Sequence, residues 1–171
     1  MLLTFVTSTL IATGSLAIAG FVLAISGLCD VLDGATSRAK HQSAPFGAFL
    51  DSTLDRYSDA LILAGAAAFF LSRHDGFMSA EILGSGLAML GSLLVSYTRA
   101  SAEAAGFECS VGAFGRPERL ITLIVGLLFG SVGLLTVVAL LAVVTNVTAV
   151  QRFVHVWAQS VVVPGARSTK T

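Results

Sequence analysis

The sequence predicts an all-α, polytopic membrane protein: a bundle of about six transmembrane helices, the first one incomplete. Of its 171 residues, 55% are hydrophobic and only 12% are charged, and the mean hydropathy is +0.87. Soluble domains carry about 25% charged residues. Apolar runs near the roughly 20 residues that cross a bilayer recur along the chain, and helices satisfy their own backbone groups in lipid. The formal net charge is zero, so no basic face argues for a nucleic-acid partner.

The first half of the chain is expected to form three helices. The apolar run 2–29 is interrupted by "ATGS" (12–15), so a half-span leads into a second helix that starts near Leu16. The breaker-rich stretch "SAPFG" (43–47) ends that helix. A third helix then runs from about Gly47 to Leu71.

The second half is expected to add three more helices. After the polar turn "SRHDG", a fourth helix runs from about Met78 to Ala105, followed by the polar loop "GFECSVGAFGRP". Pro117 suits the first turn of a fifth helix that continues to about Gly130. A sixth occupies about 134–159. We therefore expect one membrane domain over 1–160 and a tail over 161–171.

Basic residues predict the orientation. On this topology, one side holds Arg38, Lys40, Arg99, Arg116, Arg119, Arg167 and Lys170. The opposite turn holds only Arg73. By the positive-inside rule the first group is cytoplasmic. We expect a multi-pass protein of the cell (inner) membrane whose active site faces the cytoplasm.

An acidic window lies between the second and third helices. Asp30 and Asp33 share a face by i, i+3 spacing, and Asp51, Asp55 and Asp59 share one by i, i+4 spacing. Because the two helices are antiparallel neighbours, two carboxylates from each helix can converge near the cytoplasmic rim. An Asp in mid-membrane costs about 2.5–3.5 kcal/mol. Hard divalent cations such as Mg²⁺ prefer oxygen ligands, and two such ions suit displacement at phosphorus.

Two other interpretations of the acidic window stay open. Asp–Arg pairs could form a structural polar network that stabilises the bundle. Alternatively, intramembrane carboxylates could line the cation pathway of a transporter.

The same window resembles the signature of the CDP-alcohol phosphotransferases, Asp-x2-Asp-Gly-x2-Ala-Arg-x8-Gly-x3-Asp-x3-Asp. The matching positions are Asp30, Asp33, Gly34, Arg38, Gly47, Asp51 and Asp55, with Ser37 in place of the signature alanine. The resemblance implies a six-helix membrane enzyme, usually a homodimer. Such an enzyme transfers the phosphatidyl group of CDP-diacylglycerol, or a similar CDP-alcohol, to an alcohol and releases CMP.

The resemblance also implies roles for these residues. Four aspartates would bind metal, two Mg²⁺ ions with Mn²⁺ as the alternative: Asp30, Asp33, Asp51 and Asp55. Asp55 would also take the proton from the attacking hydroxyl. The CDP-alcohol would contact Asp30, Gly34, Ser37, Arg38, Ala44, Gly47 and Asp51. Within this set, Gly34 would leave room for the cytidine, and Arg38 would bind the diphosphate.

The acceptor alcohol is expected to be recognised by side chains of the later helices. The stretches "SYTRASAEAAGFE" (96–108) and "GRPERL" (115–120) resemble bacterial phosphatidylinositol-phosphate synthases, which take inositol 1-phosphate. The candidate ligands of the acceptor phosphate are Ser96, Arg99, Arg116, Arg119 and Arg152. Glycerol 3-phosphate is the alternative acceptor, although "GRPERL" stands where phosphatidylglycerophosphate synthases tend to carry a Gly-Lys-x-Lys-Thr-type stretch. Ordinary positive-inside anchoring is the alternative role for the first three arginines.

The resemblance extends from residue 14 to about 158. Relatives begin with an amphipathic segment before their first helix, whereas this chain opens at "MLLTFVTSTL". That stretch resembles the end of the first helix, which is why we expect a truncated start.

Overall fold

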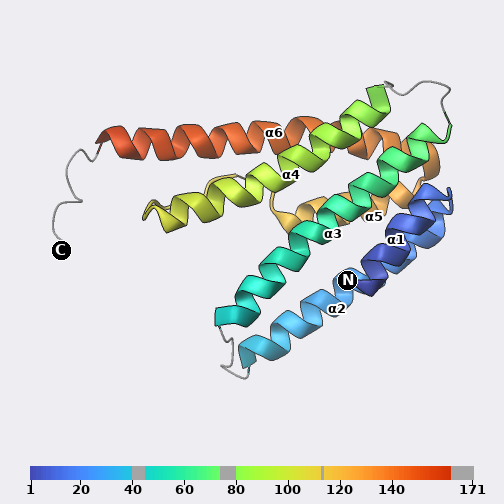
Figure 1. Ribbon diagram of the computed structural model, residues 1–171, viewed down its shortest axis with the longest axis horizontal. Helices are drawn as coiled ribbons and strands as arrows, with labels where there is room; N and C mark the ends of the chain where they lie inside the picture. Colours follow the sequence, from blue (N-terminus) through green and yellow to red (C-terminus); the bar gives the residue numbers. More distant parts are fainter. Residues whose placement is uncertain (40–44, 74–79, 113, 163–171) are drawn as a thin grey trace.

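The computed structural model describes residues 1–39, 45–73, 80–112 and 114–162, and for 31–39, 45 and 162 it describes the backbone only. These residues form six α-helices and no strand (Figure 1). The helices are α1 (Leu2–Ala12), α2 (Leu16–Ala39), α3 (Pro45–Leu71), α4 (Ala80–Ala104), α5 (Arg116–Leu128) and α6 (Gly130–Val162). The predicted all-α class is therefore confirmed for the described part of the chain.

Of the described helices, two are long and apolar enough to cross a membrane, α4 and α6. Helix α1 and the Leu16–Asp30 part of α2 are apolar but shorter. Helix α3 is 27 residues long, but Asp51, Asp55, Arg56 and Asp59 all lie within residues 51–59 of it. Six membrane crossings thus stay a prediction.

The break between α1 and α2 is the turn that "ATGS" predicts. Gly14 adopts a left-handed backbone conformation with φ +86°, which glycine reaches without steric cost. Its N–H bonds the carbonyl of Ile11, and the Ser15 N–H bonds that of Leu10. These bonds satisfy carbonyls at the end of α1. The 11-residue α1 consequently folds back along α2 and α3.

The predicted start of the last helix is wrong by about one turn. Helix α6 begins at Gly130, not near Leu134, and only Phe129 separates it from α5. Gly130 has φ +74°, so this glycine itself reverses the chain and Ser131 already lies inside the new helix. At its other end, α6 passes Gln159 and reaches Val162.

The helices pack around an apolar core. Helix α4 lies along α6, and α3 contacts both α1 and α4. Fully buried side chains from several helices meet there, among them Ile11, Leu23, Leu63, Leu127 and Leu141. Figure 1 shows α2 and α3 diverging from α4 and α6 toward one end, with the start of α5 between them.

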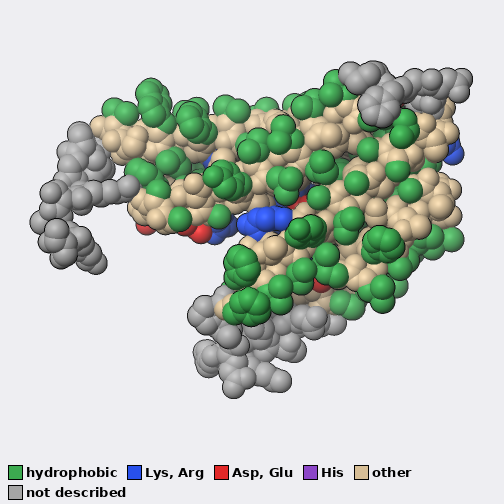
Figure 2. Space-filling view, viewed as in Figure 1, with side chains coloured by type: hydrophobic (Ala, Val, Ile, Leu, Met, Phe, Trp, Pro, Cys, Tyr) green, Lys and Arg blue, Asp and Glu red, His purple; other side chains and the backbone are tan. Residues whose placement is uncertain are grey.

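The exterior is largely apolar. Figure 2 shows hydrophobic side chains spread over the visible face, with basic and acidic groups gathered in the hollow where α3 and α4 diverge. Large apolar side chains such as Phe21, Phe129, Phe153 and Trp157 are more than half exposed. A surface of this kind fits a lipid environment, where apolar side chains face outward. We conclude that the chain is a membrane protein.

Candidate functional site

One face of α3 presents three carboxylates toward the interior of the hollow. Asp51, Asp55 and Asp59 follow one another at i, i+4 spacing, so they lie above one another on the helix. Their burial rises along the helix, because Asp51 is exposed, Asp55 is partly buried and Asp59 is only 9% exposed. The face therefore runs from solvent into the bundle.

Arg116 joins the carboxylates of two helices. It is the first residue of α5, which begins after the extended Gly115 and has Pro117 in its first turn. Its Nη2 lies 2.8 Å from Asp55 Oδ1 and 3.1 Å from Asp30 Oδ2. Asp30 stands on α2 and Asp55 on α3. The predicted convergence of carboxylates from these two helices is thus observed for this pair.

The donor set of this cluster fits a divalent cation. Carboxylate oxygens are the ligands that Mg²⁺ and related hard ions prefer, and Asp30 and Asp55 already converge on one positively charged nitrogen. Among the described side chains, no three acidic, histidine or cysteine residues are arranged to hold an ion. Arg116 supplies the positive charge between the two carboxylates, and the Asp33 side chain is outside the described part.

Deeper in the same hollow, Arg119 pairs with Asp59. Its Nη2 donates to Asp59 Oδ2 at 2.7 Å. Both residues are buried, Arg119 at 3% exposure. Asp59 therefore pairs with Arg119 on α5 and not with Arg56 of its own helix. Arg56 instead donates to the carbonyl and hydroxyl oxygens of Ser52.

Two further arginines reach the hollow from α4 and α6. Arg152 is 6% exposed, and it donates to the carbonyls of Val95 and Val111. It therefore ties α6 to α4 and to the connection before α5. Arg99 is exposed and pairs with Glu103 one turn along α4, at 2.8 Å.

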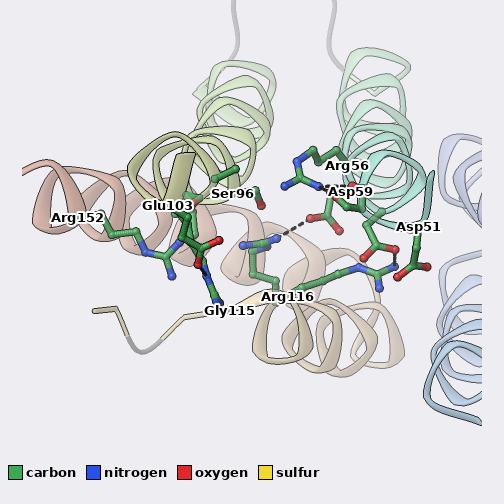
Figure 3. A pocket seen from close by; sticks show the side chains of 14 residues that line it. Asp51, Arg56, Asp59, Ser96, Glu103, Gly115, Arg116 and Arg152 are labelled. Atoms are coloured by element: carbon green, nitrogen blue, oxygen red, sulfur yellow. Dashed lines mark hydrogen bonds and ion pairs between the residues drawn. The ribbon is translucent and has the colours of Figure 1, made fainter. Parts of the chain in front are cut away.

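These residues line one cavity of about 400 Å³. Its walls are Asp51, Ser52, Asp55, Arg56, Asp59, Val95, Ser96, Arg99, Ala100, Glu103, Gly115, Arg116, Arg119 and Arg152. Figure 3 shows the labelled side chains converging from α3, α4, α6 and the start of α5. All five residues predicted to bind the acceptor phosphate are therefore brought beside two of the signature aspartates.

The predicted CDP-alcohol contacts are placed less completely. The backbone of α2 carries Asp33, Gly34, Ser37 and Arg38, whose side chains are outside the described part. Ala44 is outside the described residues, as is most of the predicted tail. Gly47 lies in the first turn of α3, and no described residue comes within 4 Å of where its Cβ atom would be. Packing against the described part of the chain therefore does not explain this glycine.

The residues predicted for the site did not include three charged residues of the cavity wall, Arg56, Asp59 and Glu103. Each had a usable signal. Arg56 follows the proposed base directly, and Asp59 continues the i, i+4 row of Asp51 and Asp55. Glu103 stands four residues after Arg99, the spacing of a helical ion pair.

This arrangement defines a class of protein. Carboxylates from two helices meet a guanidinium-lined cavity inside an otherwise apolar bundle, which suits group transfer between phosphate esters in a membrane. The chain belongs to the CDP-alcohol phosphatidyltransferase family, whose sequence model matches residues 1–164. It is accordingly a transferase.

Two relatives named as inositol phosphate synthases are similar to most of this chain. The chain is 41% identical to the archaetidylinositol phosphate synthase of Methanothermobacter thermautotrophicus over 150 residues, which span 85% of this chain and 73% of that protein. It is 39% identical to the phosphatidylinositol phosphate synthase of Mycobacteroides abscessus over 153 residues, covering 84% of this chain and 67% of that protein.

Solved structures show the same fold. The phosphatidylinositol phosphate synthase PgsA1 of Mycobacterium tuberculosis with CDP-DAG bound superposes with a TM-score of 0.79 at 31% identity, over 98% of this chain and 85% of that one. The same enzyme in complex with manganese and citrate also gives a TM-score of 0.79, over 98% of this chain and 81% of that one.

Proposed function

We propose that this protein transfers the phosphatidyl group of CDP-diacylglycerol to inositol 1-phosphate and releases CMP. The observation that carries the proposal is the single cavity that Asp51 and Asp55 share with the arginines of the later helices. Carboxylates can activate a hydroxyl, and guanidinium groups match phosphate oxygens in charge and geometry. The relatives named as inositol phosphate synthases support the choice of acceptor.

In the proposed reaction, an inositol hydroxyl oxygen attacks the phosphorus atom that carries diacylglycerol. A new P–O bond forms while the bond from that phosphorus to the CMP phosphate oxygen breaks. CMP leaves with the bonding electron pair, and the hydroxyl proton passes to the Asp55 carboxylate. Asp55 suits this task because it borders the cavity and is only partly buried.

Two divalent cations, Mg²⁺ or Mn²⁺, would be held by Asp30, Asp33, Asp51 and Asp55. Bound ions of this kind neutralise negative charge on the phosphoryl oxygens and the leaving group. Supporting this ligand set, Asp30 and Asp55 contact the same guanidinium nitrogen. On the donor side, the nucleotide would contact Asp30, Gly34, Ser37, Arg38, Ala44, Gly47 and Asp51.

The acceptor phosphate would lie at the other end of the cavity, among Ser96, Arg99, Arg116, Arg119 and Arg152. The arginines among them differ in whether a carboxylate already pairs with their charge. Arg116 is engaged by Asp30 and Asp55, and Arg99 by Glu103. Among the described residues, Arg152 donates hydrogen bonds only to neutral carbonyl groups, so no carboxylate is paired with its charge.

We further propose that the chain crosses the cell membrane several times as a homodimer, with this cavity open to the cytoplasm. The distribution of Lys and Arg supports the orientation. The exposed apolar side chains of α1, α2 and α6 support lipid and subunit contacts.

The test is an assay of CMP release in liposomes. Purified protein receives CDP-diacylglycerol and Mg²⁺, with inositol 1-phosphate, with glycerol 3-phosphate or with neither, and each arm is repeated with a chelator. We expect release that depends on inositol 1-phosphate, stops with the chelator and returns with added Mg²⁺ or Mn²⁺.

Each other outcome changes a specific part of the proposal. Release that depends only on glycerol 3-phosphate would make glycerol 3-phosphate the acceptor instead of inositol 1-phosphate. Release that persists in chelator would show that the reaction does not need the proposed metal ions. Folded protein that releases no CMP with either acceptor would contradict the proposed reaction.

A further inference from the structure

The buried ion pair between Arg119 and Asp59 is more than a packing contact. It joins the first turn of α5 to α3, and Asp59 lies outside the signature that spans residues 30–55. Taking two charges out of water is costly, and a buried pair is therefore weak evidence for stability. A pair retained at 4% and 12% side-chain exposure on a cavity wall calls for a role in the site.

Arg119 has unused hydrogen-bonding capacity. A guanidinium carries five N–H donors, and Asp59 engages only Nη2. Within the described residues, Nε and Nη1 of Arg119 are buried and find no partner. Buried donors without acceptors are uncommon in folded proteins and call for an explanation. An anion that enters the cavity would supply the missing acceptors.

Asp59 distinguishes Arg119 from the other arginines of the cavity. Glu103, the partner of Arg99, is exposed, so that pair is screened by water. Arg152 is held by backbone carbonyls rather than by a carboxylate. Among the described cavity residues, only Arg119 has a carboxylate partner that is itself buried. Its guanidinium is thereby fixed in direction.

The position of Asp59 also relates the pair to the proposed base. Asp59 follows Asp55 by four residues on one helix face, which places their Cα atoms about 6 Å apart along the helix axis. In Figure 3, the ion pair that Asp59 makes with Arg119 lies next to the α3 carboxylates that are close to Arg116. A phosphate held by Arg119 would thus sit about one helical turn from the base, a span suited to one polyol ring.

We propose that Asp59 is a positioning residue for the acceptor: it holds Arg119 by one guanidinium nitrogen and leaves the other two to bind the acceptor's phosphate. This inference rests on the proposed function. Asp59 does not touch the substrate, and it acts through Arg119. It thereby favours phosphorylated acceptors over neutral polyols.

The test compares Asp59→Asn and Asp59→Glu with the wild-type protein in the CMP-release assay. The amide of Asp59→Asn keeps the shape but loses the charge that fixes Arg119. We expect the KM for inositol 1-phosphate to rise about tenfold or more, the effect of one lost charge-assisted hydrogen bond. The KM for CDP-diacylglycerol is expected to stay within about twofold, because the proposed donor contacts do not include Arg119. Asp59→Glu, which keeps the charge, is expected to lie between the other two.

A second readout needs no turnover. Inositol 1-phosphate is expected to raise the melting temperature of the wild-type protein, but not that of Asp59→Asn. CDP-diacylglycerol is expected to raise both. As a structural control, Asn146→Ala removes a bond to the Leu87 carbonyl between α6 and α4, away from the cavity. It is expected to lower stability while leaving both KM values unchanged.

The outcomes separate the two proposals. An equal change in both KM values, or an unchanged acceptor KM in Asp59→Asn, would overturn the positioning role. If Asp59→Asn does not fold, Asp59→Glu decides by the same comparison of KM values. A wild-type protein that neither uses inositol 1-phosphate nor is stabilised by it would instead contradict the proposed function itself.

Discussion

At the scale of single residues, Asp55 is the group on which the proposed chemistry depends. It contacts Arg116 at 2.8 Å and borders the cavity. We predict that Asp55→Asn lowers the rate of CMP release by at least about 10²-fold, because general base catalysis contributes 10²–10⁴-fold and an amide cannot accept the proton. The protein is expected to stay folded, as measured by circular dichroism and its melting temperature.

Thr53→Ala is the matched control for this variant. Thr53 lies on the same helix, and its hydroxyl bonds only the Phe49 carbonyl within the described residues. It does not line the cavity. Transfer at the wild-type rate is expected for Thr53→Ala, and undiminished transfer by Asp55→Asn would remove Asp55 from the role of base.

Arg152 is predicted to serve both binding and structure. Arg152→Ala removes a charge from the cavity and leaves the carbonyls of Val95 and Val111 without their donor. We expect the KM for inositol 1-phosphate to rise more than that for CDP-diacylglycerol, with a lower melting temperature. Gln159→Ala is the control, because Gln159 bonds the Glu108 carbonyl of the same connection at 2.7 Å but does not line the cavity. If Arg152→Ala raises the KM for inositol 1-phosphate no more than Gln159→Ala does, Arg152 has no special part in acceptor binding.

Many residues of the site could be predicted from the sequence, but the contacts between them could not. Asp30, Asp51 and Asp55 follow from a spacing within one window, and the arginines from their place in an apolar chain. The contacts of Arg116 with Asp30 and of Arg119 with Asp59 span 86 and 60 residues. Such pairs depend on how α2, α3 and α5 meet, which no local spacing encodes.

At the scale of the helices, boundaries followed from chain-breaking residues where a single glycine or proline acts alone. The turn at Gly14 was predicted, as was the start of α5 near Pro117. The start of α6 was not, because Gly130 and Gly133 both stand near it and only the backbone angle of Gly130 shows which one turns the chain.

Close packing of α4 on α6 depends on Gly91. A Cβ atom at this position would lie 2.7 Å from Asn146 Nδ2 and 2.9 Å from Thr145 Cβ of α6. We predict that Gly91→Ala lowers stability by about 1–3 kcal/mol, the usual effect of overpacking. A melting temperature measured in detergent checks this expectation.

Gly86→Ala is the control for helix propensity. Gly86 lies on the same helix, and no described residue lies within 4 Å of where its Cβ atom would be. Alanine is favoured over glycine inside a helix by up to about 1 kcal/mol, so this variant is expected to be at least as stable as the wild type. A loss of stability equal to that of Gly91→Ala would show that propensity, not the contact with α6, governs both positions.

At the scale of the whole molecule, the distribution of apolar surface predicts how the chain sits in a bilayer. Helix α6 has 33 residues, so it is about 50 Å long and exceeds the hydrocarbon thickness of about 30 Å. One end must therefore leave the hydrocarbon. Trp157, the single tryptophan of the chain, lies near that end and is 62% exposed.

Tryptophan favours the boundary between lipid and water, and its fluorescence reports its depth. In vesicles, we predict that lipids brominated near the headgroup quench Trp157 more strongly than lipids brominated near the chain ends. Trp157→Phe identifies any signal that does not come from this residue. Stronger quenching by the chain-end bromines would place this end of α6 near the bilayer centre. Quenching by aqueous acrylamide alone would place it outside the membrane, and either result would contradict the predicted position of α6.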